Sequence, residues 1–191
     1  MTGTNLKQER MKGQQAGVNT NLGFQQNYLF GLDDLCRKFI SPKDVVLEVG
    51  AHRGISTQLF CTYAKEVHAV EVSPTPKLYN LTRNTDNLSL IERSSLEFFN
   101  QNKVKYDLIY IDAAHDYDNV YQDIQLSIPA LKPSGILSGH DMIAGKDPQI
   151  NGVLTAVNEI FPQVKNGDII LHRFSDSSWA ISAGDILRNK R

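Results

Sequence analysis

The sequence predicts an α/β fold, in which a mostly parallel sheet ends in an antiparallel hairpin. Short β-branched runs alternate with stretches of about 10 to 15 residues that carry apolar residues at helical spacing. Such alternation is typical of βαβ units, whose strands pair in parallel. Near the C-terminus, two apolar runs are separated only by a Ser-Asp-Ser-Ser turn at residues 175–178. A connection this short favours antiparallel pairing of the last two strands.

The N-terminal residues differ in composition from the rest of the chain. Residues 1–23 are rich in Gln, Asn, Gly, Thr and Lys and contain no aromatic residue. We expect them to form a mobile arm, and we expect residues 24–191 to form a single domain. A first helix is predicted up to a Ser-Pro stop signal at residues 41–42, with apolar positions at Tyr28, Leu32, Leu35 and Phe39.

Five strands with intervening helices are predicted next, followed by the hairpin. The five strands are expected at residues 45–49, 67–72, 88–91, 106–111 and 135–139. The helices after them are indicated by Ile55, Leu59 and Tyr63; by Pro74 as a first-turn residue; by residues 96–100; by Val120, Ile124, Ile128 and Leu131; and by Val153, Val157 and Ile160. Residues 169–174 and 179–182 are expected to form the hairpin. The total is seven strands.

Composition argues against several classes of function. The chain has 191 residues with 20 basic and 21 acidic side chains, and a net charge of −1 speaks against a general nucleic-acid or membrane-surface binder. No apolar run approaches the roughly 20 residues that cross a bilayer, and residues 1–17 lack the apolar stretch of a secretory signal. Cys36 and Cys61 are too few for a disulfide scaffold or a zinc motif. We therefore expect a cytoplasmic protein.

Candidate binding residues follow the first two predicted strands, where an open α/β sheet binds its ligands. Gly50 and Gly54 would allow a tight turn and a close approach of the backbone to a ligand. Ala51 and His52 follow Gly50, so the dinucleotide motif G-x-G-x-x-G is absent. His52 is expected at the surface, and the alternative is a contact with the ligand of this loop. Glu71, at the end of the second strand, could accept hydrogen bonds from both hydroxyls of a ribose.

A second group of candidates follows the fourth and fifth strands. Asp112 and His115 come after one strand, and His140 and Asp141 after the other. We expect these two strands to be neighbours, so that the four side chains converge. Carboxylates suit Mg²⁺, whereas the histidines would favour Mn, Fe or Zn. Taken singly, each aspartate could also be a loop cap and each histidine an ordinary surface residue.

Three segments together resemble the class I S-adenosylmethionine-dependent methyltransferases. They are the glycine loop at residues 47–57, the strand-four segment at residues 111–117 with Asp123, and the Leu-Lys-Pro-Ser-Gly turn at residues 131–135. The likeness is greatest to small-molecule O-methyltransferases of the macrocin and cephalosporin-pathway type, and more distant to catechol O-methyltransferase. It covers residues 45–142. It implies a Rossmann-like, seven-stranded, mostly parallel sheet with helices on both faces.

The resemblance also implies roles for individual residues. Glu48, Gly50, Ala51 and Gly54 would line the methionine part of S-adenosylmethionine, Glu71 would hold the ribose, and Ser94 or Ser95 would contact the adenine. Asp112, which also belongs to the cofactor site, and Asp141 would bind Mg²⁺ or another divalent cation beside His140. His115 lies where related enzymes place their general base.

The resulting expectation is methyl transfer to a hydroxyl of a small molecule, such as a sugar or a catechol-like ring. Acceptor recognition would come from the arm, from a mobile lid at residues 142–152, or from a partner copy in a homo-oligomer. Three alternatives stay open. They are a metal-independent O- or N-methyltransferase with His115 as base, a non-catalytic binder of S-adenosylmethionine or another nucleotide, and an NAD-linked oxidoreductase, against which the missing glycine motif counts.

Overall fold

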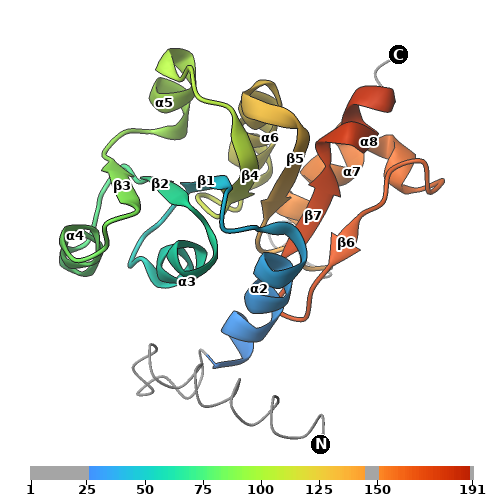
Figure 1. The fold of residues 1–191 in the computed structure, drawn as a ribbon. Coiled ribbons are helices and arrows are strands. Elements are labelled where there is room, and N and C mark those ends of the chain that lie inside the picture. The colour runs from blue at the N-terminus through green and yellow to red at the C-terminus, as the bar shows by residue number, and fades with distance from the viewer. Residues whose placement is uncertain (1–25, 145–150, 190–191) are drawn as a thin grey trace, which may run out of the picture.

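A seven-stranded sheet with the strand order β3-β2-β1-β4-β5-β7-β6 forms the centre of the molecule (Figure 1). The structure is a computed structural model that describes residues 26–144 and 151–189. Strands β1 to β5 run parallel, whereas β7 pairs antiparallel with both β5 and β6. The strands are β1 (Val45–Val49), β2 (Glu66–Val70), β3 (Leu88–Ile91), β4 (Tyr106–Ile111), β5 (Leu131–Gly139), β6 (His172–Arg173) and β7 (Trp179–Ser182).

Helices cover both faces of this sheet (Figure 1). They are α2 (Gln26–Phe39), α3 (Ile55–Tyr63), α4 (Pro76–Arg83), α5 (Ser95–Gln101), α6 (Tyr117–Ser127), α7 (Gly152–Ile160) and α8 (Ala183–Arg188). Two 3₁₀ turns span Ile128–Ala130 and Pro162–Val164. Among the described residues, no helix is both long and apolar enough to cross a membrane.

Strand residues alternate between two apolar cores, because successive side chains of a strand point to opposite faces of the sheet. In β4, Leu108 and Tyr110 join the core under α2 and α3, which contains Leu32 and Phe60. Ile109 and Ile111 join the core under α6 and α7. The parallel strands are thus buried on both faces, and their carboxyl ends remain the place where polar side chains can gather.

The predicted fold is confirmed, including the position of β4 between β1 and β5. Several element boundaries were wrong. The helix assigned to Pro74 begins instead at Pro76, because the Thr75 side chain caps it by accepting a hydrogen bond from the Leu78 N–H. Leu131, predicted on a helical face, begins β5 and pairs with Tyr106, since the helix has already ended before Pro129.

The C-terminal region also differs from the prediction. The strand expected at residues 169–174 pairs only at His172 and Arg173, and the chain continues after β7 into helix α8, which no prediction included. Ser182 begins that helix by accepting a hydrogen bond from the Gly184 N–H at 3.2 Å. The predicted arm, residues 1–23, and residues 145–150 of the predicted lid lie outside the described residues. The extent of the domain stays a prediction.

Candidate active site

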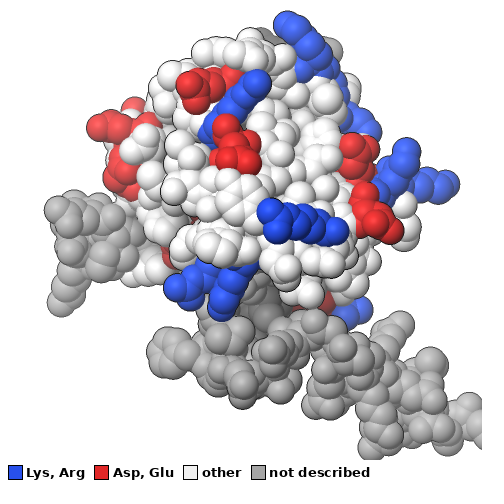
Figure 2. Space-filling view, turned by 90° about the vertical axis from the view of Figure 1, so that its left-hand side faces the viewer, with Lys and Arg blue, Asp and Glu red and all other residues white. Residues whose placement is uncertain are grey.

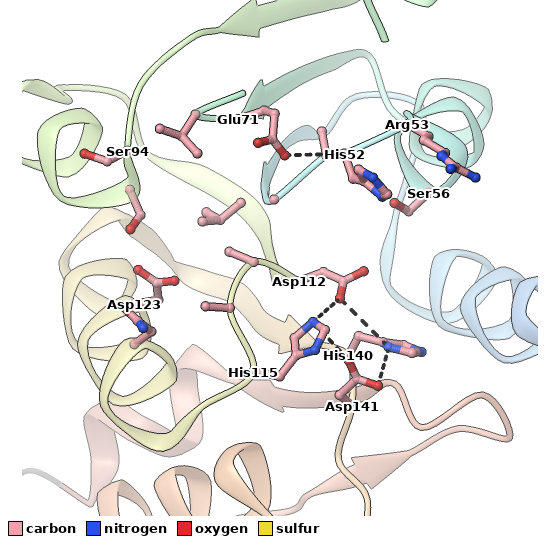
Figure 3. Close-up of a pocket in the computed structure, with 18 of the residues that line it drawn as sticks. His52, Arg53, Ser56, Glu71, Ser94, Asp112, His115, Asp123, His140 and Asp141 are labelled. Atoms are coloured by element: carbon pink, nitrogen blue, oxygen red, sulfur yellow. Dashed lines mark hydrogen bonds and ion pairs between the residues drawn. The ribbon is translucent and has the colours of Figure 1, made fainter. Parts of the chain in front are cut away.

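A cleft of about 720 Å³ opens at the carboxyl ends of the parallel strands (Figure 3). Its lining comes from the residues that follow β1, β2, β3, β4 and β5, which is the place that the sheet topology predicts. Of the candidates from sequence, the lining includes Gly50, Ala51, Glu71, Ser94, Ser95, Asp112, His115, His140 and Asp141. Glu48 and Gly54 are not among the lining residues.

The loop after β1 is shaped by two glycines with positive φ. At Gly50 (φ +92°), a Cβ would lie 2.4 Å from the carbonyl oxygen of Asp112, so only glycine lets the ends of β1 and β4 approach this closely. Gly54 (φ +76°) begins helix α3, and a Cβ there would lie 2.7 Å from Leu81. Gly54 therefore permits the packing of α3 against α4 and acts behind the cleft.

Glu48 supports this loop from inside the protein. Its side chain is fully buried and accepts hydrogen bonds from the hydroxyls of Ser56 and Thr57 in the first turn of α3. Burial raises the pKa of the Glu48 carboxyl to about 8, although the two hydroxyls act in the opposite direction. Glu48 thus ties strand β1 to the start of α3 and is not among the residues that line the cleft. Its expected contact with the cofactor stays a prediction.

Glu71 directly follows β2, and its carboxylate faces the cleft. It accepts hydrogen bonds from the backbone N–H groups of His52 (2.8 Å) and Ser73 (3.0 Å). The next residue, Val72, exposes 71% of its surface and lines the same cleft. A carboxylate beside an exposed apolar side chain is a combination that suits a ribose joined to a flat ring.

The segment after β3 forms the far wall of the cleft. Ser94 caps helix α5 in a capping box, because its hydroxyl accepts from the Glu97 N–H while its own backbone N–H donates to the Glu97 carboxylate at 3.0 Å. The Ser94 hydroxyl also donates to that carboxylate, at 2.7 Å. Ser95 hydrogen-bonds to Asp123, a buried residue of α6 whose pKa is raised by burial. The hydroxyls of both serines are thus already engaged in hydrogen bonds within the protein.

Two aspartates and two histidines meet at the ends of β4 and β5 (Figure 3). His115 Nε2 lies 3.1 Å from Asp141 Oδ2 and 3.5 Å from Asp112 Oδ1. His140 Nδ1 lies 3.1 Å from Asp141 Oδ1 and 3.9 Å from Asp112 Oδ1. The predicted convergence is therefore present, and Asp141 lies between the two imidazoles.

The charges of this cluster shift the pKa values of its members. The hydrogen bond with Asp112, together with the charge of Asp141, raises the pKa of His115 in spite of partial burial. Burial opposes the charged form of His140, but the hydrogen bond to Asp141 and the neighbouring carboxylates outweigh it and raise the pKa. The hydrogen bond from His140 lowers the pKa of Asp141. Both histidines are thus held toward their protonated form.

Sequence reasoning missed several lining residues. Arg53 and Asn119 line the cleft, as does Arg93, for which no contact was predicted. His52 is exposed, as expected, and also lines the cleft. The positions of His52 and Arg53 between two glycines of the loop were the available signal. Asp123 had been noted only as part of a motif, and its role in the cleft wall depends on helix packing that a sequence pattern does not reveal.

Comparisons with known proteins agree with this geometry. The family model described as a methyltransferase domain matches residues 47–142, half of the chain. No curated protein sequence matches the chain.

Solved structures share the fold at low identity. A protein assigned as an rRNA methylase from Clostridium thermocellum is 14% identical with a TM-score of 0.63, covering 82% of this chain and 97% of that one. A protein assigned as a caffeoyl-CoA O-methyltransferase from Staphylococcus aureus is 20% identical (TM-score 0.59, 95% and 92% covered). The N-methyltransferase NodS from Bradyrhizobium japonicum WM9, in complex with S-adenosyl-L-homocysteine, is 16% identical (TM-score 0.56, 90% and 95% covered). The chain belongs to the class I S-adenosylmethionine-dependent methyltransferases.

Proposed function

We propose that the protein transfers a methyl group from S-adenosylmethionine to a hydroxyl of a small molecule, assisted by a divalent cation. One observation carries the proposal. The Asp112–His115–Asp141 cluster and Glu71 line the same cleft, so a carboxylate suited to a ribose and a group of side chains that could hold a proton or a cation share one space. The places assigned to the cofactor, the cation and the general base all depend on this shared cleft.

The cofactor would lie along the ends of β1, β2 and β3. Glu71 keeps acceptor capacity beyond its two backbone hydrogen bonds, because an ionised carboxylate has about four acceptor sites. It would hold the ribose hydroxyls. Val72 would cover the adenine on one side, with Ser94 and Ser95 on the other wall, and Gly50 and Ala51 would leave room for the methionine part.

The donor set at the ends of β4 and β5 fits a divalent cation. Asp112, His115 and Asp141 each offer one ligand atom, and these atoms all lie within 4.8 Å of one another. Asp112 and Asp141 would hold the ion, with His140 beside them, since carboxylate oxygens and imidazole nitrogens are common ligands of such ions. A bound ion would orient the acceptor hydroxyl and lower its pKa.

In its neutral form, His115 would remove the proton of the acceptor hydroxyl, and its raised pKa makes that neutral imidazole a stronger base. Its side chain is 55% exposed, so it reaches the cleft space, while Asp112 and Asp141 orient its ring. Methyl transfer from a sulfonium needs a nucleophile held in line with the methyl carbon, and positioning of both reactants supplies much of the rate. A base at this place contributes roughly 10²–10⁴-fold.

A small acceptor is favoured by the charge distribution. Over the described residues of the face in Figure 2, basic and acidic side chains are interspersed. Surfaces that bind nucleic acids usually gather Lys and Arg on one face or along one stripe. The net charge of −1 agrees with this preference.

The test is transfer of a labelled methyl group from S-adenosylmethionine to a panel of catechols and sugars. We expect Asp141→Ala, or chelation with EDTA, to abolish transfer while S-adenosylhomocysteine still binds. Asp168→Ala, which removes an exposed carboxylate outside the cleft, is the control and should transfer at the wild-type rate. Transfer that survives both Asp141→Ala and EDTA would remove the cation from the proposal.

A metal-independent O- or N-methyltransferase is the second candidate. It is favoured by the contacts of His115, which is already oriented by two carboxylates as a general base would be. In this case EDTA does not change the rate of methyl transfer, whereas His115→Ala lowers that rate roughly 10²–10⁴-fold, the contribution of a general base.

A further inference from the structure

The turn between β6 and β7, residues 174–178, reaches the backbone at the cluster. The Met142 N–H donates to the carbonyl oxygen of Ser177 at 3.0 Å, directly after Asp141. Asp141 has φ +54° and Ser177 has φ +72°. Left-handed backbone is unfavourable for a residue other than glycine and persists only where neighbouring structure enforces it. Two such residues therefore lie on either side of one hydrogen bond.

The left-handed backbone of Asp141 matters for the cluster. Its two carboxylate oxygens contact two different histidines, with Oδ2 at 3.1 Å from His115 and Oδ1 at 3.1 Å from His140. A rotation of the backbone at this residue would move both oxygens together. The contact of Met142 with the turn is thus placed where it can fix the direction of the carboxylate.

The turn is itself held by a buried carboxylate. Asp176 accepts hydrogen bonds from the backbone N–H and the hydroxyl of Ser178, both at 3.0 Å. The Ser178 hydroxyl also lies 2.9 Å from the hydroxyl of Tyr110 in β4. Asp176 is 9% exposed. These contacts connect the turn to the same strand that carries Asp112 at its end.

Helix α2 closes the turn from the other side. A Cβ at Gly31 would lie 2.2 Å from Asp176 Oδ1 and 2.6 Å from the Asp176 backbone nitrogen. Only glycine at this position leaves Asp176 where it is. Helix α2 and the turn are therefore in direct contact, with no space between them for a side chain.

We propose that Asp176 is a positioning residue, which through the Ser177–Met142 hydrogen bond aims the Asp141 carboxylate at His115 and His140. This inference rests on the proposed function of Asp141. The turn at residues 174–178 is not among the described residues that line the cleft, so it would act on the site only through Asp141. The direction of Asp141 then also depends on the packing of α2 at Gly31.

The test uses two readouts on the full chain, both independent of the acceptor. The first is the ¹⁵N chemical shift of His115 Nε2 at one fixed pH, which responds to the proton and the hydrogen bond at that nitrogen; comparison with Asp141→Asn identifies the part due to Asp141. The second is the affinity for Mn²⁺. Asp176→Ala removes the acceptor of the turn, Asp176→Asn keeps its shape, and Gly31→Ala displaces it without changing any residue of the turn or the cleft. Asp185→Ala is the control, because Asp185 is equally buried at 8% but lies in α8.

We expect Asp176→Ala and Gly31→Ala to move the His115 shift toward the value in Asp141→Asn and to weaken Mn²⁺ binding at least roughly tenfold, as loss of a supporting residue typically does. Asp176→Asn and Asp185→Ala should stay near wild type, and S-adenosylhomocysteine affinity should be unchanged in all four. An unchanged His115 shift in Asp176→Ala, or an Asn variant as damaged as the Ala variant, would overturn the proposal. If wild type binds no Mn²⁺, the proposed cation fails, and the His115 shift alone decides on Asp176.

Discussion

The buried carboxyl of Glu48 should make stability depend on pH in an unusual direction. Most carboxylates have a lower pKa in the folded protein, but burial raises that of Glu48 from 4.5 to about 8. Between these values the folded state keeps a proton that the unfolded state has lost. The contribution of Glu48 to stability is therefore complete below pH 4.5 and declines as the pH rises toward 8.

The size of this effect follows from the shift. One proton bound only by the folded state changes the free energy of unfolding by about 1.4 kcal/mol per pH unit. Between pH 5 and pH 7 the loss is roughly 3 kcal/mol. Glu48→Gln keeps a side chain of the same shape, which can still hydrogen-bond to Ser56 and Thr57 but cannot ionise.

Urea unfolding measures the difference. The single tryptophan, Trp179, is 1% exposed, so its fluorescence reports the loss of the core. We expect the free energy of unfolding of wild type, minus that of Glu48→Gln, to fall by about 1.4 kcal/mol per pH unit between pH 5 and 7. The histidines of the cluster titrate in both proteins and cancel in the difference. Parallel curves for the two proteins would refute the assignment of a proton to folded Glu48.

Two further predictions concern glycines. Gly50→Ala should destabilise the fold by at least about 2 kcal/mol and abolish binding of S-adenosylhomocysteine, because the added methyl group would lie 2.4 Å from the Asp112 carbonyl oxygen in a backbone with positive φ. Gly167→Ala is the control, since Gly167 has φ +82° but open space around it. It should lower the free energy of unfolding in urea by only about 1 kcal/mol and leave binding intact. Gly152→Ala should slow methyl transfer while calorimetry shows unchanged affinity for S-adenosylhomocysteine. The reason is that the added Cβ would lie 2.3 Å from the His115 carbonyl oxygen and displace His115. Transfer at the wild-type rate would mean that α7 does not hold the backbone at His115.

The core of the fold was predictable from sequence because buried parallel strands are short β-branched runs. The segment Tyr106–Ile111 was predicted with both ends correct. The strand at residues 169–174 was predicted too long, because Ile169, Leu171 and Phe174 pack against the core without joining the sheet. Ile170 is exposed, and only His172 and Arg173 pair with β7. Apolar composition indicates burial there, but pairing depends on the neighbouring strand.

The site was predictable where it follows strand ends. Asp112 and Asp141 were correctly expected to lie together, because neighbouring parallel strands end at one edge of the sheet. The contacts of Glu48 with Ser56 and Thr57 were not predicted, since they depend on how the first turn of α3 packs against β1. The contact between Met142 and Ser177 joins segments more than thirty residues apart, and no local sequence pattern predicts it.

Calorimetry with S-adenosylhomocysteine on wild type and on Glu71→Ala tests the claim that the cleft binds S-adenosylmethionine. We expect one molecule to bind per chain, and the affinity to fall at least roughly tenfold in Glu71→Ala, which corresponds to about 1.4 kcal/mol for the lost ribose contacts. Asp168→Ala should bind like wild type. Absence of binding to wild type, or equal affinity in wild type and Glu71→Ala, would contradict the placement of the cofactor along β1 and β2.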